Sequence, residues 1–424
     1  MISEKLKLEI NQRTEKNFKR LSQEQYDISY VFRPLDYDWE GDFEGRSLLA
    51  FMCHYKISGR KIPCMVQMME MLDEKLNDKG YFGTQYTDIS EQQLAGHSWF
   101  MRGLSEYYEA FGEKEILCKM KKLFENLYLP VKGKVSTYPV ERKDDNGGVA
   151  GHTINAVDGW ILSTDIGTCF MSVDGLSHYY VLTKDERALE LLDEMIDFYV
   201  GVDKVKLKAQ THCTLTAARG MLRLYEACDN EKYLEKAIAT FENYVEKGMT
   251  CTYQNYNWFG REDTWTEPCA IVDSLILAIQ LYNITGCEKY KTLAKRIFAN
   301  GFASAQRPNG GAGTDTTVRP EEPVLSWKMM YEAYFCCTMR FAEGLVWVNK
   351  YAELLETPLS GEIVKDEKGR YFDGDVLFAE ITEGDKTLAE FTVEKDGHIL
   401  SPLVKYYKIP TEKQMFELKQ KVVF

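Results

Sequence analysis

The segment Tyr-Glu-Ala-Phe-Gly-Glu-Lys, residues 108–114, decides the fold of this chain. A tyrosine ends an apolar run, a glycine follows four residues later, and charged residues then open a new run. Such a phrase is typical of a helix end, a short turn and a new helix start. Comparable phrases follow four further tyrosines, which are Tyr55, Tyr180, Tyr225 and Tyr282. The sequence therefore predicts five helical hairpins.

Apolar residues on both sides of the 108–114 turn recur at helical spacing. They are Leu104, Tyr107, Tyr108 and Phe111 before the turn, and Leu117, Met120, Leu123, Phe124 and Leu127 after it. Residues 339–355 supply a further helix. Pairing that helix with one at the N-terminus would complete a set of about six helical pairs.

The spacing of the five tyrosines distinguishes a regular solenoid from a closed ring of helical pairs. The intervals are 53, 72, 45 and 57 residues, whereas a regular solenoid needs repeats of matching length. A closed ring of helical pairs tolerates uneven connections. We therefore expect an all-α (α/α)6 toroid over residues 1–357. Its long connections, at residues 128–165, 246–266 and 303–328, are expected to build a binding site.

The pattern changes after residue 357. Residues 376–381 and 388–394 are apolar or alternating runs punctuated by Gly and Asp, which predicts strands. We expect residues 358–424 to form a small β-rich C-terminal appendage that packs on the toroid.

The composition excludes several classes of function. The chain has 424 residues, of which 45% are hydrophobic, and 52 Lys and Arg against 65 Asp and Glu give a net charge of −13. Nucleic acids and anionic membranes require a concentrated positive field, so neither is expected as the main partner. The charged N-terminal stretch argues against a signal peptide or a membrane anchor. Eleven scattered cysteines indicate reduced thiols and a cytoplasmic location.

Two short patterns carry metal-binding groups. Glu267-Pro268-Cys269 opens one apolar helix, and Cys336-Cys337 opens another. One carboxylate and three thiolates at two helix starts would close a tetrahedral zinc site, since zinc favours Cys sulfur and accepts carboxylate oxygen. Helix N-termini also stabilise anionic ligands. The alternative is that these cysteines are small buried hydrophobes, as most free cysteines are.

The two patterns resemble the zinc-site signature of the β-L-arabinofuranosidases of glycoside hydrolase family 127. In both, Glu-x-Cys and Cys-Cys lie about 70 residues apart. Residues 94–112 are similar to the Ala-Gly-His helix of that family, residues 39–46 to its first Trp/Gly-rich segment, and residues 296–301 to the helix end after Glu-x-Cys. The chain departs from the family at Gly167-Thr168-Cys169, at Tyr334 and in largely lacking the C-terminal β-sandwiches.

This resemblance implies a retaining glycoside hydrolase that cleaves terminal β-L-arabinofuranoside-like residues from a small oligosaccharide or glycoside. Glu267, Cys269, Cys336 and Cys337 would bind Zn²⁺, and Cys336 would also be the nucleophile. A metal-bound cysteine is deprotonated at neutral pH and can attack an anomeric carbon to form a thioglycosyl intermediate. The product would keep its configuration, as in other double displacements.

Further roles are implied by the same resemblance. Glu262 would be the general acid/base, and its alternative is a solvated loop acid. His97 and His212 would hold sugar hydroxyls, where the alternative is a helix cap or a satisfied core histidine. Trp39 and Trp258 would stack on sugar faces, although core packing is the default for a single tryptophan.

Two other functions stay open. A metal-free α/α-toroid sugar enzyme, either an epimerase or an unsaturated-uronyl hydrolase, would use His97, His152, Asp165 and His212. A carbohydrate-binding scaffold would hold a purely structural zinc, which is the usual role of closed Cys-rich sites. The sequence also leaves a homodimer open.

Overall fold

The computed structural model of the protein describes residues 2–32, 39–142, 151–315, 332–380 and 392–402. The chain divides into two compact units. The described residues of unit 1 are 2–20, 248–257, 261–315, 332–380 and 392–402, and those of unit 2 are 21–32, 39–142, 151–247 and 258–260. Unit 1 holds the C-terminal strands together with α1 and the helices from α12 onward, and unit 2 holds the helices between them.

All five predicted helical hairpins are confirmed. In each turn, a residue with a left-handed backbone donates its N–H to the carbonyl of the tyrosine four positions earlier, at 2.7–2.9 Å. The donor and acceptor residues are Gly59 and Tyr55, Gly112 and Tyr108, Lys184 and Tyr180, Asp229 and Tyr225, and Gly286 and Tyr282. The tyrosine marks the helix end because its carbonyl is one of those that the last helical turn leaves without a partner.

Unit 2 alternates helices that are buried over most of their length with half-buried ones. Every position of α5 (Glu91–Phe111) from Glu91 to Ser105 is buried. In contrast, α6 (Lys114–Leu123) buries a single stripe at helical spacing. The other buried helices are α3 (Asp42–Ser58), α7 (Ser172–Thr183) and α10 (Thr211–Cys228), and their half-buried partners are α4 (Pro63–Lys75), α8 (Glu186–Gly201) and α11 (Glu231–Lys247).

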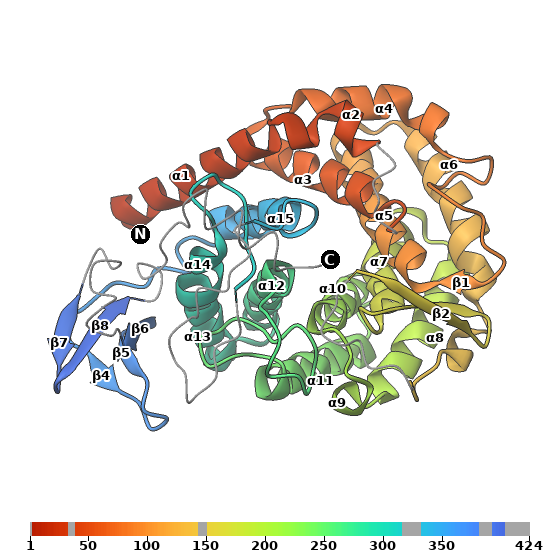
Figure 1. Ribbon diagram of the computed structural model, residues 1–424. Coiled ribbons are helices and arrows are strands. Elements are labelled where there is room, and N and C mark those ends of the chain that lie inside the picture. Colours follow the sequence, from red (N-terminus) through yellow and green to blue (C-terminus); the bar gives the residue numbers. More distant parts are fainter. Residues whose placement is uncertain (1, 33–38, 143–150, 316–331, 381–391, 403–424) are drawn as a thin grey trace. The chain divides into compact units, whose positions relative to one another are not determined.

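The buried helices of unit 2 pack side by side in chain order, α3 on α5, α5 on α7 and α7 on α10 (Figure 1). The contact of α3 with α5 depends on Gly45. A Cβ atom at this position would lie 2.2 Å from the backbone nitrogen of Phe100. The backbones can therefore approach this closely only because Gly45 has no side chain.

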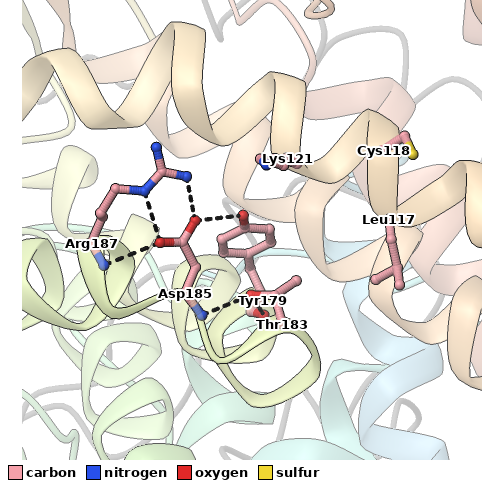
Figure 2. Close-up of a pocket in the computed structure, with 7 residues that line it drawn as sticks. All are labelled: Leu117, Cys118, Lys121, Tyr179, Thr183, Asp185 and Arg187. Atoms are coloured by element: carbon pink, nitrogen blue, oxygen red, sulfur yellow. Dashed lines mark hydrogen bonds and ion pairs between the residues drawn. The ribbon is translucent and has the colours of Figure 1, made fainter.

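The turn between α7 and α8 shows how one hairpin is fixed (Figure 2). Asp185 caps α8, because its carboxylate accepts the N–H of Arg187 at 3.1 Å. The same carboxylate accepts from the hydroxyl of Tyr179 and from the Arg187 guanidinium. These side chains and Thr183, with Leu117, Cys118 and Lys121 of α6, line a pocket of about 430 Å³. The Asp185 carboxylate is already bonded to Tyr179 and Arg187, and no predicted site residue lines this pocket.

The connection at residues 128–165 supplies two strands of a small three-stranded sheet. Strands β2 (Thr153–Val157) and β3 (Trp160–Ser163) are antiparallel, and β1 (Ile89–Ser90) pairs in parallel with β3. Asp158 and Gly159 join β2 to β3 with φ values of 51° and 82°, which is the backbone of a two-residue hairpin turn. The sequence analysis missed this hairpin, although Asp-Gly is its usual signal.

The remaining short elements of unit 2 are η1 (Glu24–Tyr26), α2 (Ile28–Val31), η2 (Phe124–Tyr128), η3 (Leu129–Val131), η4 (Val135–Thr137), η5 (Thr168–Met171) and α9 (Lys204–Leu207).

Unit 1 is built around α12 (Pro268–Thr285). The elements packed on it are α13 (Glu288–Arg296), the π-helix η6 (Ile297–Phe302) and α15 (Cys337–Lys350). The short α14 (Ala303–Ala305) continues η6, and α1 (Glu4–Leu21) contributes its residues up to Arg20. By length and composition α12 is the one described helix that could cross a membrane, but 72% of that stretch is buried inside the protein, as in a core helix.

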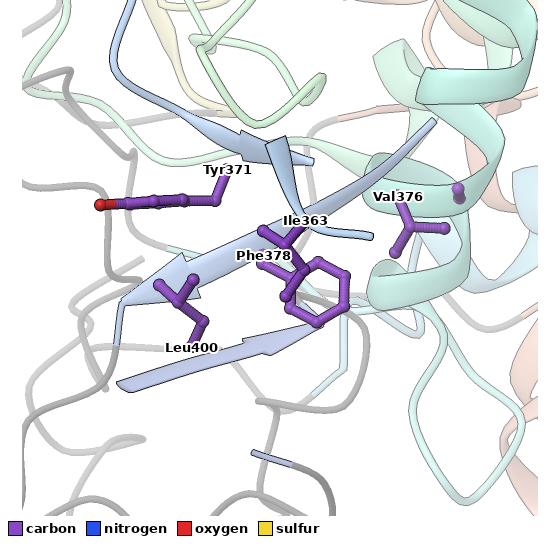
Figure 3. Close-up of a cluster of buried hydrophobic side chains, with 6 residues drawn as sticks. Ile363, Tyr371, Val376, Phe378 and Leu400 are labelled. Carbon is purple, nitrogen blue, oxygen red and sulfur yellow. The ribbon is translucent and has the colours of Figure 1, made fainter. Parts of the chain in front are cut away.

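The C-terminal strands of unit 1 form an antiparallel sheet in the order β4-β5-β6-β8-β7. They are β4 (Val364–Lys365), β5 (Tyr371–Asp373), β6 (Val376–Glu380), β7 (Val393–Lys395) and β8 (His398–Pro402). One face packs Ile363, Tyr371, Val376, Phe378 and Leu400 together with Ala299 of η6 (Figure 3). The strand predicted at residues 376–381 is β6. The strand predicted at 388–394 begins in residues outside the described ones, and its end lies in β7.

Candidate metal centre

Glu267, Cys269, Cys336 and Cys337 come together in unit 1, at the N-termini of α12 and α15. Glu267 is the N-cap residue of α12, and Cys269 follows Pro268, whose fixed φ suits the first helical turn. Cys336 is the N-cap residue of α15, and Cys337 is its first residue. The two pairs meet because α12 and α15 pack together with their N-termini at the same end.

The cluster has the dimensions of a four-coordinate zinc site. One ligand atom from each of the four residues lies within 4.8 Å of the other three. The Cys337 sulfur is 3.5 Å from the Cys269 sulfur and 3.3 Å from the Cys336 sulfur. Zinc–sulfur bonds of about 2.3 Å place tetrahedral sulfurs roughly 3.8 Å apart. Small adjustments of the side chains would therefore accommodate the ion.

Burial differs among the four candidate ligands. Cys269 and Cys337 have no exposed surface and Glu267 is 8% exposed, whereas Cys336 is partly exposed. Cys336 is therefore the sulfur that an incoming molecule can reach most easily. This difference agrees with the nucleophile role that the resemblance implied for Cys336.

The charge of the sulfurs in the cluster depends on burial, on the helix N-termini and on whether a cation is bound. Burial, together with the sulfurs of Cys269 and Cys336, raises the pKa of the Cys337 thiol well above its usual range. A bound divalent cation has the opposite effect and deprotonates a coordinating thiol. The N-termini of α12 and α15 add partial positive charge at the same place, which favours the thiolate form of the sulfurs. Three sulfurs and one carboxylate are a donor set that zinc prefers, so these residues fit a zinc ion.

A buried ion pair fixes α12 against α15 one helical turn beyond the cluster. The Arg340 guanidinium lies 2.6 Å from the Asp273 carboxylate, and their side chains are 1% and 0% exposed. Arg340 also pairs with Glu343 of its own helix. Asp273 follows Cys269 by four positions, and Arg340 follows Cys336 by four. The ion pair therefore fixes the relative position of the two ligand pairs along the axes of α12 and α15.

Residues of two of the long connections hold the entry of α12. Thr266 donates its N–H to the Asp315 carbonyl at 2.8 Å, and its hydroxyl accepts the Asp315 N–H at 3.0 Å. The Arg307 guanidinium neutralises the buried Asp315 carboxylate at 2.6 Å. Glu267 itself donates its N–H to the Asn255 side chain at 2.8 Å. Residues 316–328 of the predicted site connection lie outside the described residues.

Glu262, the predicted general acid/base, is exposed in the connection that precedes α12. Its neighbours Arg261 and Asp263 form an ion pair at 2.9 Å. The Thr264 hydroxyl donates to the Arg261 carbonyl at 2.8 Å and accepts the Asn257 N–H at 3.0 Å. Glu262 therefore stands on an ordered turn, and its catalytic role stays a prediction.

The predicted sugar-binding residues lie in unit 2, and His97 is fully buried there. Its Nε2 accepts the Phe82 N–H at 2.9 Å, so Nδ1 carries the proton and donates to the Gln93 carbonyl at 2.8 Å. Burial lowers the pKa of His97 to about 4. This is the satisfied core histidine that the sequence left as an alternative. A direct bond to a sugar would require one of these backbone bonds to break.

His212, Trp258 and Trp39 also belong to the packed interior of unit 2. His212 stacks on Trp99 with ring centroids 5.6 Å apart and an interplanar angle of 7°. Trp258 is fully buried and pairs with Gln210 at the start of α10. Trp39 is 6% exposed and donates its indole N–H to the Gly151 carbonyl at 3.2 Å. Their roles in sugar binding stay predictions.

Three residues that support the cluster were missed in the sequence. Asp273 and Arg340 are charged residues inside largely buried helices, and a charge in such a run is the signal that could have identified them. Asn255 lies in a polar segment that the sequence analysis treated as part of a loop. The sequence does not reveal that Asp273 pairs with Arg340, because 67 positions separate the two residues.

No family model matches this chain, and no curated protein matches it either. Solved structures share its fold at low identity. A cellobiose 2-epimerase from Bacillus thermoamylovorans B4167 matches with a TM-score of 0.52 and 14% identity, over 73% of this chain and 88% of the epimerase. A β-arabinofuranosidase of glycoside hydrolase family 127 matches with a TM-score of 0.53 and 14% identity, over 90% of this chain and 63% of that structure. An unsaturated glucuronyl hydrolase specific for heparin matches with a TM-score of 0.53 and 10% identity, over 82% of this chain and 99% of the hydrolase.

These likenesses show the fold, which is that of the α/α-toroid enzymes that act on carbohydrates. The predicted fold class, helical pairs with a small C-terminal β part, is confirmed. This chain spans less than two thirds of the family 127 structure. Because the three proteins are named for different reactions, the fold does not choose among them, and a functional proposal must depend on the side chains.

Proposed function

We propose that the protein is a zinc-dependent, retaining glycoside hydrolase that removes terminal β-L-arabinofuranoside-like residues from small glycosides or oligosaccharides. The observation that carries the proposal is the convergence of Glu267, Cys269, Cys336 and Cys337, whose ligand atoms lie within 4.8 Å of one another. The shared fold with a β-arabinofuranosidase of family 127 supports it. The fold that the protein shares with an epimerase does not by itself require three cysteine sulfurs close together.

Each of the four residues has its own part in this proposal. A bound zinc would keep the coordinating sulfurs deprotonated at neutral pH. Cys269, Cys337 and Glu267 are buried and hold the cluster together, whereas Cys336 is partly exposed and presents its sulfur to the substrate. A thiolate is a strong nucleophile even where a hydroxyl would need a neighbouring base.

The reaction proceeds in two displacements. The Cys336 sulfur attacks the anomeric carbon, the bond from that carbon to the leaving oxygen breaks, and the Glu262 carboxyl gives its proton to that oxygen. Glu262, now a carboxylate, then takes a proton from a water molecule that attacks the same carbon. The carbon–sulfur bond breaks and the Cys336 thiolate is restored. Two inversions leave the configuration unchanged.

A protein whose metal is purely structural is the second candidate. The closed set of four protein ligands favours it, because catalytic zinc sites usually keep one position open. The partial exposure of Cys336 favours catalysis instead. The two candidates differ in what happens when the Cys336 sulfur is replaced by oxygen, since a structural site has no turnover to lose.

The test combines metal analysis with a panel of p-nitrophenyl glycosides that includes the β-L-arabinofuranoside. We expect close to one zinc per chain, release of p-nitrophenol, and loss of turnover in Cys336→Ser. Cys118→Ser is the matched control, because Cys118 is an exposed cysteine on α6. Zinc without activity on any glycoside of the panel would leave the metal a structural role and overturn the proposal.

A second variant tests the acid/base assignment. Glu262→Gln is expected to slow hydrolysis of alkyl glycosides more than that of aryl glycosides, because aryl leaving groups need less protonation. Asp263→Asn is the control, since it changes the adjacent exposed carboxylate on the same turn. Equal effects on both classes of leaving group would remove Glu262 from the mechanism while leaving the nucleophile in place.

A further inference from the structure

A buried polar hairpin, residues 248–257, leads from the candidate metal centre to the C-terminal sheet inside unit 1. Met249 pairs with Asn255 in antiparallel fashion, and the Thr250 N–H donates to the Gln254 carbonyl at 2.9 Å. The Thr250 hydroxyl accepts the Gln254 N–H at 3.0 Å. Thr250, Thr252, Gln254 and Asn255 are at most 4% exposed. A turn bonded internally in this way is displaced as one piece when its tip moves.

One end of this hairpin holds the two residues that lead into α12. The Asn255 side-chain oxygen accepts the N–H of Glu267 at 2.8 Å. The Gln254 amide donates to the Asp315 carboxylate at 3.4 Å, and Asp315 is bonded to Thr266 through two backbone groups. The hairpin therefore fixes the backbone of both Thr266 and Glu267, and the Glu267 backbone determines where its carboxylate can point.

The tip of the hairpin is held by residues of the sheet and of α13. Arg370 donates to the Cys251 carbonyl at 3.0 Å, and its guanidinium lies 5.4 Å from the Tyr253 ring centroid and 5.2 Å from that of Phe372 in β5. Arg296, at the end of α13, donates to the Tyr253 hydroxyl at 2.9 Å and lies 4.8 Å from the Phe372 ring centroid. Two cations and an aromatic ring of the sheet thus surround one tyrosine.

The surroundings of this tip leave it little room to move. A Cβ atom on Gly301 of η6 would lie 2.3 Å from the Tyr253 carbonyl oxygen, so η6 and the hairpin are in direct backbone contact. Asn300, beside Gly301, attaches the sheet to η6. Its side chain donates to the Asp375 carbonyl at 2.9 Å and accepts the Leu377 N–H at 2.7 Å. The sheet, η6 and the hairpin therefore form one connected support for α12.

We infer that the C-terminal sheet positions the candidate metal ligand Glu267, and that Arg370, Tyr253 and Asn255 transmit its position. The inference rests on the metal site of the proposed function and is independent of which sugar is cleaved. Without Arg370 the tip loses a bond to the Cys251 carbonyl and a cation over two rings. Asn255 then holds the Glu267 backbone less tightly, and the carboxylate occupies its place at the metal for less of the time.

Cobalt absorption measures this effect directly. In Co²⁺-loaded protein the thiolate-to-cobalt band in the near ultraviolet reports the three sulfurs, and the visible ligand-field bands report the coordination geometry. We expect Arg370→Ala to keep the thiolate band, to change the visible bands, and to weaken zinc binding by about tenfold, within the range seen when outer partners of metal ligands are lost. Asn255→Ala should do the same more strongly, and Arg370→Lys should restore part of the effect.

Lys365→Ala is the matched control. It removes a cation that lies 5.0 Å from the Tyr371 ring on the neighbouring strand, and Tyr371 belongs to the sheet face that packs on Ala299. If Arg370→Ala and Lys365→Ala both bind zinc like the unmodified protein and give its cobalt spectrum, the inference is wrong. If circular dichroism shows that Arg370→Ala does not fold, the same metal-binding measurements on Arg370→Lys and Tyr253→Phe test the inference. Tyr253→Phe removes only the hydroxyl that Arg296 contacts.

The same experiment separates this inference from the proposed function. Metal binding with the expected spectral changes, but without cleavage of any glycoside, would support the inference and overturn the hydrolase. Cleavage of a glycoside, together with unchanged cobalt spectra in Arg370→Ala and Asn255→Ala, would support the hydrolase and overturn the inference. A protein that binds neither cobalt nor zinc would overturn both.

Discussion

Replacing Asp273 by alanine tests whether the ion pair between α12 and α15 sets the arrangement of the metal ligands. The change leaves a guanidinium that is 1% exposed with Glu343 as its remaining carboxylate partner. Removing one partner of a buried ion pair costs about 3–5 kcal/mol. Because Glu343 still compensates part of the Arg340 charge, we expect the lower end, about 3 kcal/mol. That loss raises the unfolded fraction by roughly a hundredfold.

Urea unfolding of the metal-free protein measures the loss, and a chelator competition measures zinc affinity. Asp273→Leu combined with Arg340→Met and Glu343→Leu is the matched control, since it removes all three charges of the buried cluster, and such apolar replacements are often neutral or stabilising. We expect the triple variant to recover most of the stability and of the zinc affinity. A loss below 1 kcal/mol in Asp273→Ala, with unchanged zinc affinity, would refute the argument that this pair sets the ligand positions.

Three further outcomes follow from the same structure. Cys269→Ser should lower bound zinc from near one equivalent to a small fraction, because it removes one of four ligands, and full occupancy by metal analysis would contradict a four-ligand site. In Cys336→Ser, an arabinofuranose-configured haloacetamide should no longer label the chain, whereas in the unmodified protein mass spectrometry should find the label on Cys336; a label on a carboxylate would contradict the nucleophile. The protein should lose up to about 3 kcal/mol of stability as the pH falls from 6.5 to 4, because the pKa of His97 is lowered to about 4 by burial and the unfolded chain takes up the proton first, near pH 6.5. His97→Gln should flatten this part of the pH dependence of the urea midpoint, and an unchanged slope would assign the effect to other groups.

The local signals for helices could be read from the sequence because they depend on neighbours along the chain. The tyrosine phrases predicted all five turns, since the bond that ends each helix joins residues only four positions apart. The apolar spacing on both sides of the 108–114 turn likewise predicted helices there, and these are α5 and α6. The β2–β3 hairpin carried an equally local signal, Asp158-Gly159, and was missed because the surrounding residues were treated as one long connection.

The site was predicted in part, and the part that was missed is nonlocal. The sequence predicted a metal site from the types and order of four residues, Glu267, Cys269, Cys336 and Cys337. In the structure, one ligand atom from each of them lies within 4.8 Å of the others. His97 was named from the same resemblance, yet both of its ring nitrogens are bonded to backbone groups in the core. A histidine's sequence context does not reveal which backbone groups its ring will meet.

The sequence by itself therefore determined where five helical hairpins turn, the class of fold and the donor set of the candidate metal centre. Only the tertiary structure decided that Arg340 meets Asp273, that Asn255 holds Glu267, and that Arg370, which directly precedes β5, contacts the hairpin beside the ligands. The physical reason is that helix capping and apolar periodicity act over a few residues. Pairing of buried charges and polar side chains depends instead on which distant backbones pack together, because such groups become stable only in the presence of a partner that packing supplies.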